Sequence, residues 1–111
     1  MNAAHYVALF FGGMFLFNAI PHLCAGVMGR PFQSPFATPH GVGLSSSTVN
    51  VLWGFFNLAV AWGLLARVGH LDLQEWDRVL VMGAGGLLIS LFAARHFGRF
   101  HGGDLAPTAS K

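Results

Sequence analysis

The sequence predicts an all-α integral membrane protein with three transmembrane helices and a loop rich in proline and glycine between the first two. Hydrophobic residues make up 54% of the 111 residues and charged residues only 9%, against about 25% charged in an ordinary soluble domain. So few charges cannot cover a soluble globule with hydrated groups. The apolar residues form three long segments, and the chain length allows one domain. We place this domain at residues 1–101, followed by a flexible polar tail at 102–111.

The first predicted span covers about residues 5–28. As a helix this segment is about 36 Å long, enough to cross about 30 Å of hydrocarbon with some tilt. Pro21 removes one backbone hydrogen bond and crowds the preceding turn, so we expect a kink near residues 17–21. Cys24 lies in the same apolar segment and is expected to be a small buried residue.

Residues 29–47 are not expected to be helical. Pro31, Pro35 and Pro39 recur every four residues, and this density of proline favours extended and turn conformations. Phe32 and Phe36 each follow a proline closely. We expect the segment to pack on the end of the helical bundle or to lie among the lipid headgroups.

Two further spans are predicted at about residues 48–66 and 76–98. Ser and Thr residues at 45–48 offer several N-caps for the second span. Asp72 and Glu75 resemble a capping box, which predicts that the third helix begins near Leu73, with Trp76 as an aromatic anchor at the interface. The connector at 69–72 is short, so the second and third spans are predicted to be antiparallel neighbours.

The basic residues predict an orientation in a bacterial-type inner membrane. Arg67 and Arg78 lie on the side of the N-terminus. The loop and tail on the opposite side carry the larger group of basic residues, which are Arg30, Arg95, Arg99 and Lys111. Because basic residues collect on the cytoplasmic side, we expect the N-terminus outside and the C-terminus in the cytoplasm.

Small residues at a spacing of four predict where the helices pack. Lipid tails are as apolar as leucine, so helices in a membrane associate through close backbone approach and interhelical hydrogen bonds. The predicted packing residues are Gly12, Ala59, Gly63, Gly86, Ser90 and Ala94. These contacts can form within one chain or between chains. Three helices leave much surface uncovered, so a homo-oligomer or a larger membrane complex is expected in addition to the lipid bilayer.

Polar residues within the spans form a predicted layer at one depth. At about 1.5 Å per residue, His22 and Asn50 lie about 10 Å to the cytoplasmic side of the midplane, and Arg95 and His96 about 12–14 Å. Asn18 and His22 share one face of the first helix, because they are four residues apart. The complete set of candidate site residues is Asn18, His22, Asn50, Asn57, Arg95, His96 and Arg99.

The sequence leaves several functions open for this layer. The asparagines can simply join helices, in a protein that acts as a self-associating or accessory subunit. Alternatively, His22 and Arg95 bind a small anion or a lipid headgroup. A third possibility is haem b or a metal ion held by His22 and His96, which are candidates for bis-histidine ligation.

Other classes of function receive little support. No Asp or Glu lies in the apolar run of any span, since the four acidic residues are Asp72, Glu75, Asp77 and Asp104, and this argues against an enzyme and against proton-coupled export. The six Lys and Arg residues are scattered over three regions and form no nucleic-acid-binding face.

Overall fold

A computed structural model describes residues 1–103 and 105, and most of these residues are helical. The helices are α1 (Ala3–Val27), α2 (Ser47–Trp62) and α3 (Trp76–His101), and α2 continues as the π-helical segment η1 (Gly63–Val68). Three helices, with α2 and η1 counted as one, are long and apolar enough to cross a membrane. The three predicted helices are therefore confirmed, and the second extends beyond residue 66. Most of the predicted tail lies outside the described residues.

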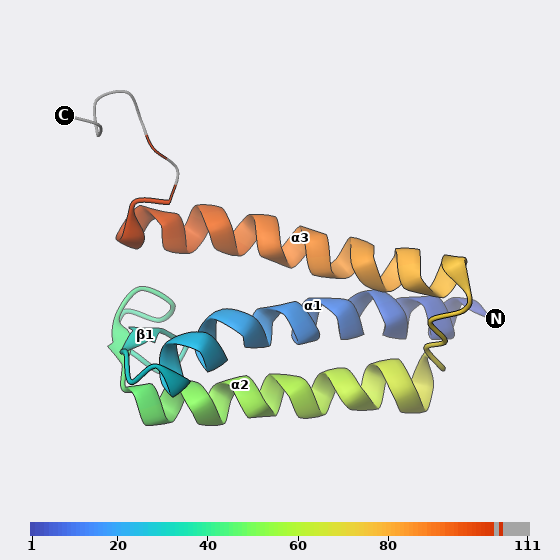
Figure 1. Ribbon diagram of the computed structural model, residues 1–111, viewed down its shortest axis with the longest axis horizontal. Helices are drawn as coiled ribbons and strands as arrows, with labels where there is room; N and C mark the ends of the chain where they lie inside the picture. The colour runs from blue at the N-terminus through green and yellow to red at the C-terminus, as the bar shows by residue number, and fades with distance from the viewer. Residues whose placement is uncertain (104, 106–111) are drawn as a thin grey trace.

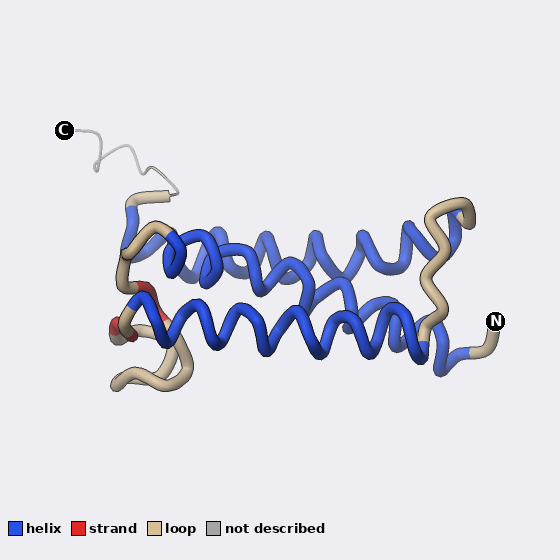
Figure 2. Tube along the Cα trace, turned by 60° about the horizontal axis from the view of Figure 1, so that its bottom comes forward, coloured by secondary structure: helices blue, strands red, loops and turns tan. Residues whose placement is uncertain are grey.

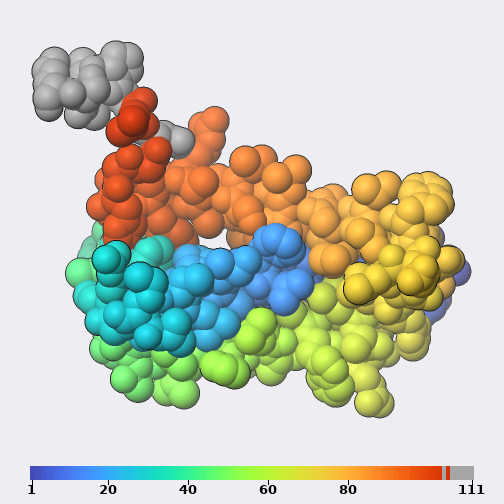
Figure 3. All heavy atoms as spheres, in the orientation of Figure 1, coloured from blue at the N-terminus to red at the C-terminus, as the bar shows by residue number. Residues whose placement is uncertain are grey.

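Helix α1 is the centre of the bundle. It packs against both α2 and α3, whereas α2 and α3 make almost no direct contact with each other. Figure 1 shows α1 between the other two helices, and Figure 3 shows its atoms filling that position. The prediction that the second and third spans are neighbours is therefore wrong.

The connector explains this error. Helix α3 begins at Trp76 rather than near Leu73, and its N-cap Glu75 makes no side-chain capping bond. The Asp72 carboxylate instead accepts a hydrogen bond from the backbone N–H of Gln74 at 2.9 Å. The connector therefore spans 69–75, which is long enough to pass the end of α1 (Figure 1).

Glycines allow α1 and α3 to approach closely. A Cβ on Gly13 would lie 2.0 Å from the carbonyl oxygen of Met82, and one on Gly85 would lie 1.9 Å from that of Phe10. Gly86, a predicted packing residue, meets the ring of Phe17 in the same way. At the N-terminal end of α3 the Tyr6 hydroxyl donates a 2.7 Å hydrogen bond to the Asp77 carboxylate, which joins α1 to α3.

The other predicted packing residues divide into two groups. Gly12 is buried, and a Cβ there would meet Leu65 of η1. Ala59 is exposed and Gly63 has no atom within 4 Å of its Cβ position, so this pair does not pack within the chain. Ser90 and Ala94 lie where α3 has separated from α1, and they line a crevice between the two helices.

The loop between α1 and α2 folds over one end of the bundle. Strand β1 (Phe32–Gln33) pairs antiparallel with β2 (Leu44–Ser45), with Phe32 opposite Ser45. Figure 2 shows both strands confined to this end. Gln33 and Ser34 are buried, so the loop contributes polar side chains to the interior. Cys24 is exposed, which corrects the prediction that it is buried, because it lies on the side of α1 that also exposes Ile20 and Val27.

Candidate functional site

His22 and Asn50 form the buried polar centre of the protein. His22 is 2% exposed and Asn50 is 0% exposed. The Asn50 amide nitrogen lies 3.0–3.2 Å from the backbone oxygens of Phe32, Ser45 and Ser46, and donates to them. The Asn50 oxygen is therefore the acceptor for His22 Nδ1, which lies 2.7 Å away. In the neutral ring the proton is on Nδ1, and Nε2 carries the free lone pair.

A second pair of side chains, formed by two asparagines, joins the same two helices closer to the middle of the bundle. Asn18 of α1 donates to the side-chain oxygen of Asn57 at 3.0 Å, and Asn57 donates to the Trp53 backbone oxygen at 2.8 Å. The Asn57 side chain is fully buried. The structure thus brings four of the predicted site residues together in two pairs across α1 and α2.

The remaining predicted residues lie on α3, where only His96 reaches the same region. Its Nε2 donates to the Gly41 backbone oxygen at 2.7 Å, and its Nδ1 accepts from the Arg99 guanidinium at 2.9 Å. Arg95 is exposed on α3. Beyond His96, His101 Nε2 contacts the Gln33 side-chain oxygen at 2.9 Å. These two histidines fasten the loop to α3.

A cavity of about 370 Å³ lies where α2 and α3 are apart, with α1 as its floor and the loop as its cover. Its lining residues are Asn18, His22, Ser34, Pro35, His40, Gly41, Trp53, Phe92, His96 and Phe97. We call this space the histidine cavity. Ser34, His40 and Gly41 were absent from the predicted site, because only the fold of the loop places them near α1. In the sequence, the proline-rich segment that contains them predicted only that it is not helical, and not that its side chains approach α1.

Two polar groups at the histidine cavity have unused hydrogen-bonding capacity. His22 Nε2 has no hydrogen-bond partner among residues 1–103 and 105, although its residue is almost fully buried. The indole N–H of Trp53 is buried and has no partner in the same part of the chain. The indole nitrogen is fully buried and has no surface on the cavity, whereas His22 Nε2 is not among the fully buried unpaired atoms of the described residues and keeps some surface there. In its neutral form His22 Nε2 accepts a hydrogen bond.

The geometry bears on the anion and metal interpretations. Arg95 does not line the histidine cavity, and the lining contains no Lys or Arg, so His22 and Arg95 are not brought together. Both ring nitrogens of His96 are engaged, and bis-histidine ligation would have to break one of these contacts. No cluster of three or more His, Cys, Asp or Glu residues suited to a metal ion occurs in the described residues.

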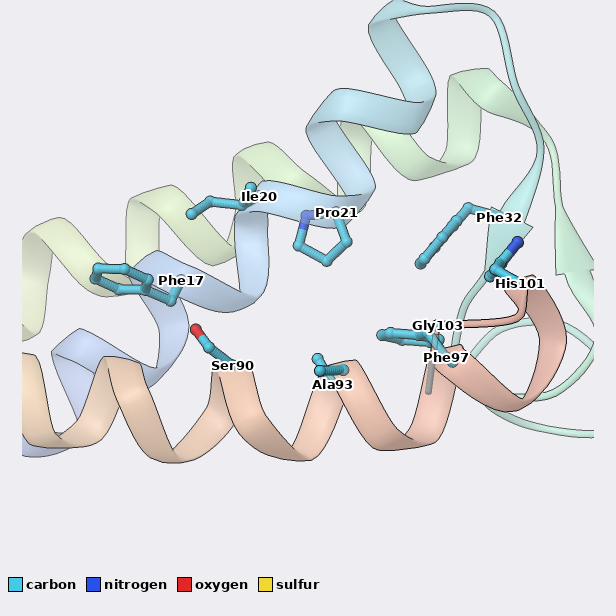
Figure 4. Close-up of a pocket in the computed structure, with 11 residues that line it drawn as sticks. Phe17, Ile20, Pro21, Phe32, Ser90, Ala93, Phe97, His101 and Gly103 are labelled. Carbon is cyan, nitrogen blue, oxygen red and sulfur yellow. The ribbon is translucent and has the colours of Figure 1, made fainter. Parts of the chain in front are cut away.

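A second hollow lies on another side of the bundle, between α1 and α3. Helix α1 bends away from α3 in the half that contains Pro21 (Figure 1), as the proline predicted. The crevice has a volume of about 480 Å³. Figure 4 shows Phe17 and Pro21 of α1 facing Ser90 and Phe97 of α3 across it. Phe97 lines both hollows, so its ring separates the crevice from the histidine cavity.

The fold and the site define a three-helix protein with an apolar exterior and, at one end, an open and mostly apolar cavity whose lining contains no Lys, Arg, Asp or Glu. The chain was compared with models of protein families, with curated proteins and with solved structures, and none of the three comparisons found a match. The interpretation of the site therefore depends on its geometry.

The contact between His96 and Gly41 predicts a local effect of mutation. Replacing His96 by Phe removes the donor to the Gly41 carbonyl and keeps an aromatic ring at this position. We expect faster amide hydrogen exchange in residues 34–43, with exchange in α1 and α2 unchanged, because only the loop loses an attachment. Arg95→Leu on the same helix is the control. Unchanged amide hydrogen exchange in the loop of the His96→Phe variant would show that the bond from His96 to the Gly41 carbonyl does not hold the loop against α3.

Proposed function

We propose that this protein spans the membrane and binds a small uncharged polar ligand, or the polar head of a lipid, in the histidine cavity. The observation that carries the proposal is His22, which is 2% exposed and keeps an unpaired Nε2 in the cavity lining. His22 Nε2 is not among the fully buried unpaired atoms of the described residues, so it keeps some surface on the cavity. It can therefore accept a hydrogen bond from a ligand there.

Asn50 supports the same proposal. A residue that only joins two helices needs one hydrogen bond between them, as Asn18 and Asn57 have. Asn50 instead donates through its amide nitrogen to the loop and accepts through its side-chain oxygen from His22 Nδ1. These bonds fix the orientation of the imidazole ring and leave Nε2 as its unprotonated nitrogen. Histidines that bind metal ions are commonly oriented in the same way, by a hydrogen bond from the other ring nitrogen.

The membrane environment is proposed from the surface of the helices. The three helices meet the length and hydropathy expected of spans, and many large apolar side chains on them are exposed, among them Leu52, Phe55, Trp62, Leu87 and Leu91. In water this surface would drive aggregation, whereas lipid would cover it. We retain the proposed inner-membrane location with the N-terminus outside, and the proposed self-association.

Native mass spectrometry from a mild detergent tests the proposal. We expect wild-type protein to retain a bound small molecule, His22→Leu to lose it and Arg95→Leu to retain it. Loss from Arg95→Leu alone would favour the anion interpretation. Wild-type protein without bound mass, and not stabilised against heat by added lipid extract, would show that the polar residues only join helices. The same spectra report the number of chains per particle and thus test self-association.

A further inference from the structure

We infer that the ligand of the histidine cavity is a neutral hydroxylated aromatic ring with an apolar tail, that is, a lipid-soluble phenol or quinol. The inference rests on the proposed function and specifies the class of ligand. Three features of the cavity support this class of ligand: the hydrogen-bond acceptor that it offers, its aromatic walls, and the space beside it.

The hydrogen-bonding groups select a hydroxyl. Because Asn50 holds the proton on Nδ1, His22 Nε2 can only accept, and it requires an O–H or N–H donor from the ligand. A ligand hydroxyl supplies this donor. The indole N–H of Trp53 is fully buried and takes no part in the contact. A phosphate ester lacks the proton and carries charge, and the cavity lining has no Lys or Arg to compensate it.

The walls select a ring. Trp53 and Phe97 stand edge-to-face against the His22 ring, with centroids 6.3 and 6.1 Å away. Phe92 stacks on His96 at 5.6 Å, so the α3 side of the cavity is also aromatic. A planar ring fits between such walls through offset and edge contacts. The volume of about 370 Å³ lies at the small end of the range for ligand pockets, which suits one ring and its substituents.

The space beside the cavity suits a tail. Asn18 lines the histidine cavity and also a smaller hollow of about 150 Å³, whose other lining residues are Met14, Phe15 and Ile89. This second hollow is apolar apart from Asn18 and lies nearer the middle of α1 and α3. Asn18, held by its hydrogen bond to Asn57, lies between these two hollows. The histidine cavity is open beside Phe92, which is 60% exposed, so the alkyl chain of a ligand can extend there into the surrounding lipid.

Trp53 provides a spectroscopic test. The chain has three tryptophans, so Trp62→Phe/Trp76→Phe leaves Trp53 as the only one. We expect decylhydroquinone to quench its emission saturably. The dimethyl ether of that compound and the corresponding decylquinone, which lack the O–H, should bind about tenfold more weakly or worse. A protein that retains only Trp76, which is 75% exposed, is the control for quenching by probe dissolved in the detergent.

Two variants connect the binding to the proposed contacts. His22→Leu should abolish the preference for the hydroquinone over its ether, and Arg95→Leu should keep it.

The outcomes separate the two proposals. Decanol binding as tightly as decylhydroquinone, with loss of both in His22→Leu, would overturn the aromatic class and leave the proposed function standing. The same holds if no probe binds but native mass spectra still show a molecule that depends on His22. No saturable binding of any probe, together with no retained molecule, would overturn both.

Discussion

Asn50→Ala is expected to cost about 2–4 kcal/mol of stability, because each buried polar group left without a partner costs about 1–3 kcal/mol. The substitution frees His22 Nδ1 and removes the amide that donates to the backbone oxygens of Phe32, Ser45 and Ser46. All these groups lie at the junction of α1, α2 and the loop. Reversible unfolding in mixed detergent and SDS micelles, followed by circular dichroism, would measure the loss.

Asn57→Ala is the matched control. It removes one asparagine of equal burial from the same helix, but frees only Asn18 and one backbone oxygen. Interhelical hydrogen bonds in membranes average about 0.6 kcal/mol and reach about 1.7 kcal/mol, so Asn57→Ala should cost clearly less than Asn50→Ala. Equal losses would mean that the network around Asn50 adds nothing beyond one interhelical bond.

Gly85→Ala is expected to separate α1 from α3. The added methyl group would lie 1.9 Å from the Phe10 carbonyl oxygen, which belongs to a helical backbone and cannot rotate aside. Overpacking of this kind costs about 1–3 kcal/mol where side chains can adjust, and a backbone contact leaves less room to adjust. The same unfolding assay should show a large loss, with a comparable loss for Gly13→Ala, which faces the Met82 carbonyl.

Gly83→Ala provides the control on the same helix. Nothing lies within 4 Å of its Cβ position, so the substitution should leave stability unchanged or raise it through the higher helix propensity of alanine. If Gly83→Ala and Gly85→Ala behave alike, the close contact between α1 and α3 does not contribute to stability.

The helices could be predicted because their signals are local. Long apolar segments define the three helices, and the proline-rich segment at 29–47 excludes a fourth. The capping pair at Asp72 and Glu75 misled the prediction, since Asp72 bonds to Gln74 and delays the start of α3. That delay lengthened the connector and changed which helices are neighbours. A local error of a few residues therefore produced an error in packing.

The candidate site could be predicted only in part. Spacing along single helices placed Asn18 and His22 on one face, and the counting of depths placed Asn50 near them. The pairing of His22 with Asn50, and of Asn18 with Asn57, depends on how α1 and α2 pack and needed the structure. Arg95 shares the depth of His96 but points elsewhere, because depth alone does not give the direction of a side chain around a helix.

The central position of α1 has a consequence for assembly. Each later helix packs mainly on α1, with α3 also bonded to the loop through His96 and His101, and α2 and α3 make almost no contact with each other. The His22–Asn50 pair is complete once α2 has joined α1, whereas the aromatic wall from Phe92 to Phe97 arrives only with α3. His22 and this aromatic wall of the proposed ligand cavity thus lie on two helices that attach to each other only along part of their length, so a displacement of α3 at this end leaves the His22–Asn50 pair intact.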